Sequence, residues 1–320
     1  MIKNLFVTLM LFVALAFVTA CSNDEEQESG FRYNPSSEAS QVSWITPNSV
    51  AIKAGKRSIV LLSSEKSILE DVEKAYNMAM TPDIKNVVWA DFDDTDHIKG
   101  CLFSGLTPST TYYYVTLVYN NVDEYFSYGD MGSFITDEPI EEIVDLGLAV
   151  KWRGWNLGAE TPYERGDGYM WGYTTVGYLT NPTYPQEANI VGTEYDAARV
   201  KLGDSWRLPT KQECEELSEK CTFQKVSCYD EKNDISWYGV YVTGPSRKHI
   251  FIPMTWTLTV NDYYKLDYFN TCCFWIGESD LSNGDRYYYS GYIEGSLESS
   301  FGAIRHCNNN WDLPIRAVKD

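Results

Sequence analysis

The sequence has few of the residues on which common hydrolytic and metal sites depend. It contains three histidines, at positions 97, 249 and 306, which are too scattered for the spacing of a zinc site. The G-x-S-x-G pattern of serine hydrolases does not occur. Acidic residues are plentiful, but no pair of them stands out as a glycosidase pair, so that possibility stays open. The sequence favours a protein without catalytic activity, and we predict no metal ion and no cofactor.

Positive charge is also scarce. The 320 residues include 26 Lys and Arg against 45 Asp and Glu, a formal net charge of −19. Nucleic acids and anionic membrane surfaces attract clustered Lys and Arg, so this balance argues against both as partners. Aromatic residues are abundant, at 15% with 24 Tyr and 10 Trp. We expect most of them in β-rich structure and some at a binding surface.

The start of the chain has the pattern of a secretory signal peptide over residues 1–20. Lys3 precedes an apolar run over 5–18, which is short for a membrane span of roughly 20 residues. The run V-T-A-C then resembles the lipobox of bacterial lipoproteins, which implies a lipid on Cys21 that anchors the protein in a membrane. An acidic, apolar-poor segment follows and predicts a disordered tether over 21–33. It resembles the surface-export signal of Bacteroidetes lipoproteins, which implies an outer-membrane location facing the cell exterior.

Residues 34–138 predict an all-β sandwich, because short alternating segments recur with turn signals between them. The expected strands are 42–44, 50–52, 59–62, 87–89, 98–103 and 111–119. The run G-L-T-P-S-T-T-Y-Y-Y-V-T-L-V-Y, followed by G-S-F-I-T, resembles fibronectin type III domains. That resemblance implies a corner contact made by Tyr112 or Tyr113. Residues 70–80 depart from it, because their sequence indicates a partly helical connection.

An acidic cluster, Asp91-x-Asp93-Asp94-x-Asp96, has some features of a calcium loop. An EF-hand needs glycine at its sixth position and an acid at its twelfth, where this chain has Asp96 and Leu102. A solvated acidic turn is the better interpretation, with adventitious calcium as the alternative. Residues 137–142, D-E-P-I-E-E, then predict a short polar hinge before the second domain.

Residues 139–320 form the second predicted domain. Its motifs are V-D-L-G-L-A-V-K-W, N-L-G-A, Y-M-W-G, D-A-A-R, S-W-R-L-P-T-K-Q-E-C-E-E-L and, at the end, W-D-L-P-I-R-A-V. In this order they resemble the Fibrobacter succinogenes major-domain family of secreted bacterial proteins. The resemblance implies an α+β, C-type-lectin-like fold with a mixed sheet, two helices and long loops. Calcium-dependent sugar binding is disfavoured, because no E-P-N or Q-P-D triplet occurs between Trp275 and Trp311.

Local patterns support this shape. Residues 194–202 predict a helix that ends at Gly203, and Thr210 with Glu213 predicts a capping box at the start of a second helix. Cys214, Leu217 and Cys221 recur on one face of that helix, which we expect to be buried. The expected strands are 238–242, 250–252, 274–277, 286–292 and 303–306, and Trp171 and Trp206 are expected in the core.

Seven cysteines follow Cys21, an odd number that leaves at least one thiol unpaired within the chain. An extracytoplasmic location permits one or two disulfides, but no pairing follows from the sequence. The adjacent Cys272 and Cys273 should point to opposite faces of a strand, so we expect at most one of them to be buried.

Two long connections, 174–192 and 255–271, are the predicted binding loops. Their aromatic side chains are the candidate ligand contacts, although half or more of them could instead cover the domain: Tyr178, Tyr184, Trp256, Tyr263, Tyr264 and Tyr268. The leading hypothesis is a non-catalytic binding or adhesion protein whose ligand is a glycan or a surface protein. The alternative is an accessory or tip subunit of a surface assembly, and an enzyme such as a glycosidase is the weaker alternative.

Overall fold

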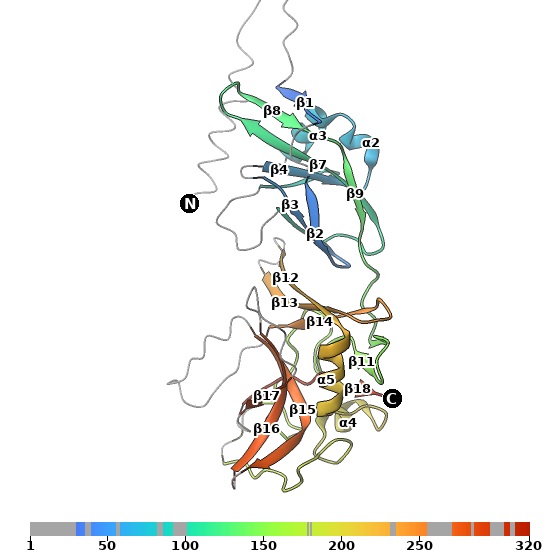
Figure 1. The fold of residues 1–320 in the computed structure, drawn as a ribbon, viewed down its shortest axis with the longest axis vertical. Helices are drawn as coiled ribbons and strands as arrows, with labels where there is room; N and C mark the ends of the chain where they lie inside the picture. The colour runs from blue at the N-terminus through green and yellow to red at the C-terminus, as the bar shows by residue number, and fades with distance from the viewer. Residues whose placement is uncertain are drawn as a thin grey trace, which may run out of the picture.

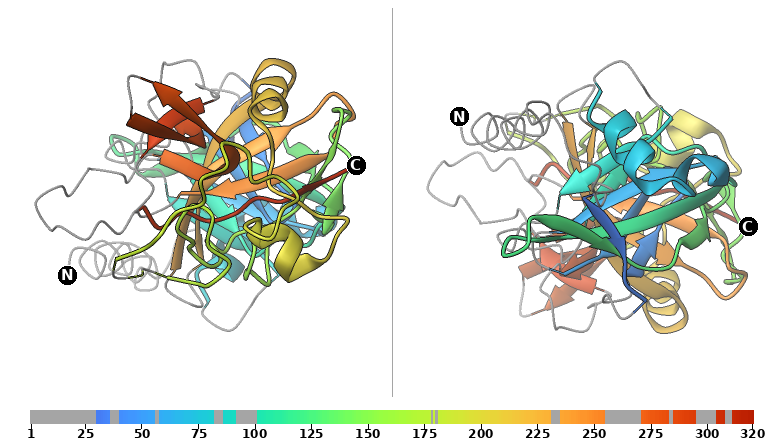
Figure 2. Two further views of the ribbon diagram at one scale, coloured as in Figure 1. Left: turned by 90° about the horizontal axis from the view of Figure 1, so that it is seen from below. Right: turned by 90° about the horizontal axis from the view of Figure 1, so that it is seen from above.

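A computed structural model shows an elongated, mostly β-structured molecule (Figure 1). It describes residues 30–35, 40–55, 58–81, 86–91, 101–177, 179, 181–230, 235–254, 271–282, 285–294, 304–307 and 311–320. Viewed end-on, the two halves of the chain lie one behind the other along the long axis (Figure 2). Among the described residues, no helix is both long enough and apolar enough to cross a membrane.

The described part of the first half is a β-sandwich of two sheets. One sheet has the order β2-β3-β6, and its strands are Gln41–Ile45, Ser49–Lys53 and Cys101–Ser104. The other has the order β1-β8-β7-β4-β5, with β9 also paired to β7. Its strands are β1 (Phe31–Tyr33), β4 (Ser58–Ser63), β5 (Val88–Asp91), β7 (Thr111–Asn120), β8 (Tyr125–Tyr128) and β9 (Gly132–Ile135). The predicted sandwich is confirmed at this level, and the predicted strands fall on observed ones within the described residues.

The two sheets enclose a core of alternating inward side chains, such as Val50 and Ile52 from β3 and Val60 and Leu62 from β4. The outer face of the larger sheet is covered by two short helices, α2 (Lys66–Leu69) and α3 (Val72–Ala79), which face the viewer from above in Figure 2. The helical connection predicted over 70–80 is therefore confirmed. The Asp93, Asp94 and Asp96 positions of the acidic cluster lie outside the described residues.

The prediction of a disordered tether over 21–33 extends too far along the chain. Residues 31–33 were expected in it, yet they form β1, which runs parallel to β8 with Phe31 opposite Phe126 and Tyr33 opposite Tyr128. The apolar side chain of Phe31 packs against the aromatic residues below α3, which stabilises the strand. A three-residue strand carries too little sequence pattern to be recognised without its partner.

The described residues of the second half form three small sheets and two helices. The first sheet, β10-β11-β18, joins the start of this half to the end of the chain through strands Ile143–Val144, Lys151–Arg153 and Val318–Lys319. The second consists of β12 (Thr222–Asp230), β13 (Ile235–Thr243) and β14 (His249–Pro253). The third consists of β15 (Thr271–Ser282), β16 (Asp285–Glu294) and β17 (Ile304–Cys307). The predicted strands of this region are confirmed.

The predicted helix end at Gly203 and the predicted capping box at Thr210 are confirmed, but the first helix begins at Ala197 and not at residue 194, because Asp196 is its N-cap. α4 (Ala197–Leu202) is followed by Gly203 at φ +96°, a backbone angle that favours glycine. α5 (Lys211–Lys220) begins with a complete capping box between Thr210 and Glu213. Cys214 and Leu217 are buried on its inner face, whereas Cys221 is the C-cap residue and only half-buried.

Strand β15 lies between two cores, and this overturns the expectation for the adjacent cysteines. Cys272 packs into the core with Trp152 and Phe274, and Cys273 into the core with Trp171 and Trp275. Both thiols are buried, because apolar side chains cover both faces of the strand. Trp171 and Trp206 are buried in the second core, as expected.

The two halves meet through a sheet-on-sheet contact, which we call the junction. Trp44, Ala51 and Leu102 on the outer face of β2-β3-β6 share one cluster with Val226, Tyr241 and Phe251 of β12-β13-β14. These two sheets lie next to each other in Figure 1. Because their other faces are buried in separate cores, the molecule is a continuous stack of layers along its long axis.

The linker over 137–142 is polar, as predicted, but it is held at several points and is not a free hinge. The Tyr241 hydroxyl donates to Asp137 Oδ2 over 3.0 Å. Lys248 Nζ lies 3.4 Å from Glu138 Oε2 and 3.7 Å from Glu141 Oε1. Beside the linker, the junction is also bridged by the hydroxyl of Tyr163, which donates to the Asn48 side chain over 2.6 Å.

Candidate ligand-binding site

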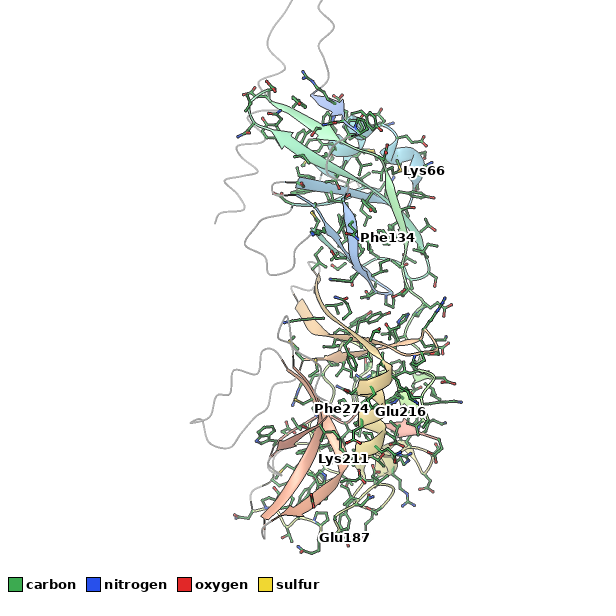
Figure 3. All side chains as sticks on the ribbon, viewed as in Figure 1. Lys66, Phe134, Glu187, Lys211, Glu216 and Phe274 are labelled. Carbon is green, nitrogen blue, oxygen red and sulfur yellow. The ribbon has the colours of Figure 1, made fainter. Side chains whose placement is uncertain are left out.

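Of the predicted ligand contacts, Tyr184 is the one that the structure describes. The other predicted ligand contacts lie outside the described residues: Tyr178, Trp256, Tyr263, Tyr264 and Tyr268. The predicted lipidation residue, Cys21, also lies outside them. Tyr184 belongs to the loop over 172–192, which we call the distal loop. Glu187 of this loop lies at the end of the molecule farthest from the sandwich (Figure 3).

The distal loop begins at a pair of buried tryptophans. The Trp171 indole donates to the carbonyl of Ile276 on β15 over 3.0 Å. In return, the Trp275 indole donates to the carbonyl of Tyr169 over 2.6 Å. Both rings are almost fully buried. A buried indole with its N–H satisfied is costly to displace, so the start of the loop is fixed to the sheet.

The end of the distal loop is fixed to the same strand. The amide of Ile190 donates to the carbonyl of Gly277 over 2.8 Å, and the amide of Ser279 donates to the carbonyl of Ala188 over 2.7 Å. A Cβ atom at Gly277 would lie 2.4 Å from a methyl carbon of Val191, so only glycine permits this close approach. Loop and strand therefore form a small added ladder.

The D-A-A-R motif holds the last residue of the distal loop, Gly192. The Asp196 carboxylate is buried and accepts hydrogen bonds from the amides of Gly192 and Leu208, over 2.8 and 2.9 Å, and from two amides of α4. Burial raises the pKa of Asp196, while these backbone donors act in the opposite direction. The carboxylate thus connects the loop to the segment that leads into α5.

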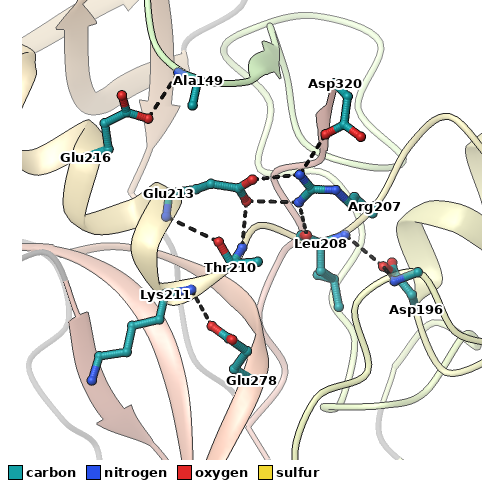
Figure 4. A network of polar contacts seen from close by, with 11 residues as sticks. Ala149, Asp196, Arg207, Leu208, Thr210, Lys211, Glu213, Glu216, Glu278 and Asp320 are labelled. Carbon is teal, nitrogen blue, oxygen red and sulfur yellow. Dashed lines mark hydrogen bonds and ion pairs between the residues drawn. The ribbon is translucent and has the colours of Figure 1, made fainter.

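Figure 4 shows how that segment is fixed in turn. The Arg207 guanidinium donates to both oxygens of Glu213, over 2.9 and 2.6 Å, and to Asp320 at the end of the chain. These bonds hold the pKa of Glu213 below its usual value, although burial opposes the shift. The D-A-A-R and S-W-R-L-P-T-K-Q-E-C-E-E-L motifs therefore support the distal loop.

Within the loop, Tyr184 forms a pair with Tyr173. The ring centroids are 5.7 Å apart at 88°, and the Tyr173 hydroxyl donates to the carbonyl of Thr183 over 2.6 Å. Tyr184 is half-buried and its hydroxyl oxygen is buried, so it braces the loop more than it presents a face to solvent. Sequence reasoning missed Tyr173, because its role depends on the return of the chain at residues 183–184.

The exposed surface of the distal loop is almost free of charge. Glu187 is the single charged residue among residues 172–192 of a chain whose net charge is −19. Several small polar side chains and Val176, which is 54% exposed, are presented to solvent: Thr175, Asn181, Thr183, Gln186 and Asn189. Hydroxyl and amide groups on a rigid support suit an uncharged, hydrogen-bonding ligand.

The junction also contains a group of three polar side chains, Thr243, His249 and Asp137. His249 Nδ1 lies 3.0 Å from Thr243 Oγ1, and its Nε2 lies 3.8 Å from Asp137 Oδ2. The order of these side chains is that of a hydrolase triad, but 3.8 Å is too long for a hydrogen bond. Asp137 instead accepts from Tyr241, whose ring stacks on His249 at 4.8 Å. The group holds the linker to β13 and β14.

Metal and thiol chemistry find no support in the part of the chain that the structure describes. It contains no group of three or more His, Cys, Asp or Glu side chains placed to hold a metal ion. Four of the described cysteines have free thiols: Cys101, Cys214, Cys221 and Cys272. Burial raises the pKa of Cys101 to about 12 and that of Cys221 to about 11, which makes these thiols poor nucleophiles.

No family model and no curated protein matches this chain. Among solved structures, a computer-redesigned β-sandwich protein is 15% identical, with a TM-score of 0.21, and covers 31% of this chain and 86% of its own. The sensor domain of the anti-sigma factor RsgI4 from Pseudobacteroides cellulosolvens is 20% identical, with a TM-score of 0.19 and coverage of 31% and 92%. A segment of two fibronectin type III domains from chicken tenascin is 8% identical, with a TM-score of 0.20 and coverage of 88% and 98%. These TM-scores are too low to assign a function to this chain.

Proposed function

We propose that this chain is a surface lipoprotein of the Bacteroidetes type that acts as a non-catalytic binding or adhesion protein for a glycan or a surface protein. One observation carries the proposal. The distal loop carries a single charged residue, Glu187, and is anchored at both ends, and it lies at the end of the stack of layers remote from β1. In this arrangement the sandwich acts as a rigid spacer, and the second domain presents the loop.

The finer fold assignments belong to the same proposal. In the sandwich, the Tyr112 hydroxyl accepts a hydrogen bond from the Thr107 amide over 3.0 Å. A bond between a tyrosine hydroxyl near the start of a late strand and the backbone a few residues upstream is typical of immunoglobulin-like and fibronectin type III domains, and it supports Tyr112 over Tyr113 as the corner residue. In the second domain, the pairing of the early strand β11 with the last strand β18, together with the helices α4 and α5, supports the C-type-lectin-like assignment.

The membrane attachment rests on the lipobox at Cys21 and has its own test. Cells expressing the full chain should incorporate an alkyne fatty acid into the protein, and Cys21→Ser should abolish the label. Protease added to intact cells should remove the protein if it faces the exterior. A labelled chain that resists external protease would support the lipid anchor and contradict surface display.

The distal loop is tested by a pair of matched substitutions. Val176 on the loop and Val200 on α4 are 54% and 51% exposed, so neither change should unfold the protein. Val176→Glu adds a charge to the nearly uncharged surface of the loop, whereas Val200→Glu places the same charge elsewhere. On arrays of glycans, mucins and surface proteins, we expect Val176→Glu to lose the ligand and Val200→Glu to keep it. Equal binding by both variants would show that the distal loop does not contact the ligand.

The alternative of an accessory or tip subunit depends on exposed strand edges. β5 is an edge strand with Val88 51% exposed, and Ile135 of β9 is 61% exposed. These features permit edge pairing, but both strands have only four residues, and short edges resist it. We therefore place assembly second. An enzyme remains the weaker alternative, because the His249 group described above lacks a hydrogen bond to its carboxylate.

A further inference from the structure

The sandwich carries an aromatic row at its β1 edge, far from the distal loop. Because β1 and β8 are parallel and in register, Phe31, Tyr33, Phe126 and Tyr128 all point to the face that carries α3. Phe31 stacks on Phe126, with ring centroids 5.3 Å apart at 18°. Tyr33 meets Tyr128 edge-on at 5.8 Å and 61°. The row is therefore two rings wide and two rings long.

The inner and outer ends of this row differ in exposure. At the inner end, Tyr76 of α3 covers Phe31 and Phe126, with centroids 5.3 and 5.0 Å away. At the outer end, Tyr33 is 54% exposed, the highest value among the large apolar and aromatic side chains of β1 and β8. The inner rings explain the packing of β1, but they do not require an aromatic residue at position 33.

Tyr33 is held in one orientation although it is exposed. Its hydroxyl donates to Asp130 Oδ1 over 2.6 Å, and its ring packs against that of Tyr128. The bond to Asp130 raises the pKa of the Tyr33 hydroxyl, so the proton stays on Tyr33. A ring fixed at two points loses little entropy when a ligand stacks on it, which is the advantage of preorganisation.

The hydrogen-bonding character of this outer end selects the class of ligand. The Tyr33 proton is already used by Asp130, so the pair offers acceptor oxygens and no hydroxyl donor. A proline-rich peptide would need donors for its carbonyl groups. A sugar supplies its own hydroxyl donors and an apolar ring face for stacking. The carboxylate, and the net charge of −19, disfavour acidic sugars.

We propose that Tyr33, Tyr128 and Asp130 form a stacking subsite for a neutral glycan. The sugar ring lies on the exposed face of Tyr33, and its hydroxyl groups donate to the free lone pairs of the Asp130 carboxylate. The subsite gives the sandwich a binding role of its own, beyond its role as a spacer. It is independent of the ligand of the distal loop.

The test uses the full chain in native gels that contain a soluble polysaccharide. The neutral probes are glycogen, galactomannan and mixed-linkage β-glucan, and the acidic probe is polygalacturonate. Tyr33→Ala removes the stacking ring. Tyr125→Ala is the matched control, because Tyr125 lies on the opposite face of β8, below the Arg32 side chain at 4.2 Å. Asp130→Asn keeps the ring and weakens the acceptor.

We expect at least one neutral polymer to retard the protein. Tyr33→Ala should weaken that binding roughly tenfold or more, Asp130→Asn should weaken it less, and Tyr125→Ala should leave it within about twofold. The distal-loop variant Val176→Glu should also keep it, which separates this subsite from the loop. The proposal is overturned if no neutral polymer retards the protein or if Tyr33→Ala binds normally. It is equally overturned if polygalacturonate, or a proline-rich peptide in calorimetry, binds through Tyr33 instead.

Discussion

Replacement of Phe251 by alanine should uncouple the two halves of the molecule. Phe251 on β14 is 1% exposed and belongs to the junction cluster with Trp44 and Ala51. Its ring centroid lies 5.1 Å from that of Tyr163, which itself bonds across the junction to Asn48. Loss of this ring leaves a cavity between the sheets that both halves share.

The size of the effect can be compared with a matched variant. Truncation of a buried phenylalanine costs about 3–5 kcal/mol in unfolding free energy. Phe274 is also 1% exposed, but it packs in a core that is internal to the second half. Phe274→Ala should therefore cost a similar amount, or roughly 2–4 °C in Tm for each kcal/mol. The two variants should lose a similar unfolding free energy, but only Phe251→Ala should allow the two halves to unfold separately.

Calorimetry and proteolysis measure that difference. We expect the wild-type protein and Phe274→Ala each to unfold in a single transition, and Phe251→Ala to unfold in two. Glutamate-specific protease should cut the Phe251→Ala linker faster at Glu141 and Glu142, which the other two proteins hold against the second half. Two transitions in the wild type, or equal cleavage of both variants, would refute the shared junction.

Three further substitutions test local features. Burial lowers the pKa of His249 in the folded protein. As pH falls below about 6.5, this histidine is therefore protonated in the unfolded chain before it is protonated in the folded protein. The His249 contribution to stability is present above that pH and lost below it, and urea midpoints at pH 8 and pH 5 should differ less in His249→Gln. Thr210→Ala should cost about 1 kcal/mol in urea unfolding, because it removes the N-cap of α5. Tyr112→Phe should cost about 1 kcal/mol, since the Thr107 amide loses its acceptor; an unchanged midpoint in either variant would contradict its assigned bond.

Features that depend on a few neighbouring residues could be predicted from the sequence. The capping box at Thr210 and the helix end at Gly203 are local, because side chain and backbone within one turn decide them. Strands such as Thr111–Asn120 were recognisable because aromatic and β-branched residues follow one another. The sequence narrowed the proposed corner residue to two tyrosines, and only Tyr112 supports the assignment by accepting a hydrogen bond from the Thr107 amide.

Features that depend on distant partners could not be predicted. The strand at Phe31–Tyr33 exists because β8, almost a hundred residues later, pairs with it and covers Phe31. The burial of both Cys272 and Cys273 required a core on each side of β15. Alternation along a strand predicts which side chains share a face, but it does not show whether one face or both are covered.

The same distinction applies to the candidate sites. The sequence by itself determined the local elements and pointed to the loop that contains Tyr184, because turn residues and aromatic residues mark such a segment. Only the tertiary structure decided that Tyr184 turns inward onto Tyr173 and that Tyr33 projects outward, fixed by Asp130. The junction, likewise, appeared in the sequence only as a polar linker. The physical reason is that exposure and contact across sheets are set by segments far apart in the chain, and no local pattern records which of them meet.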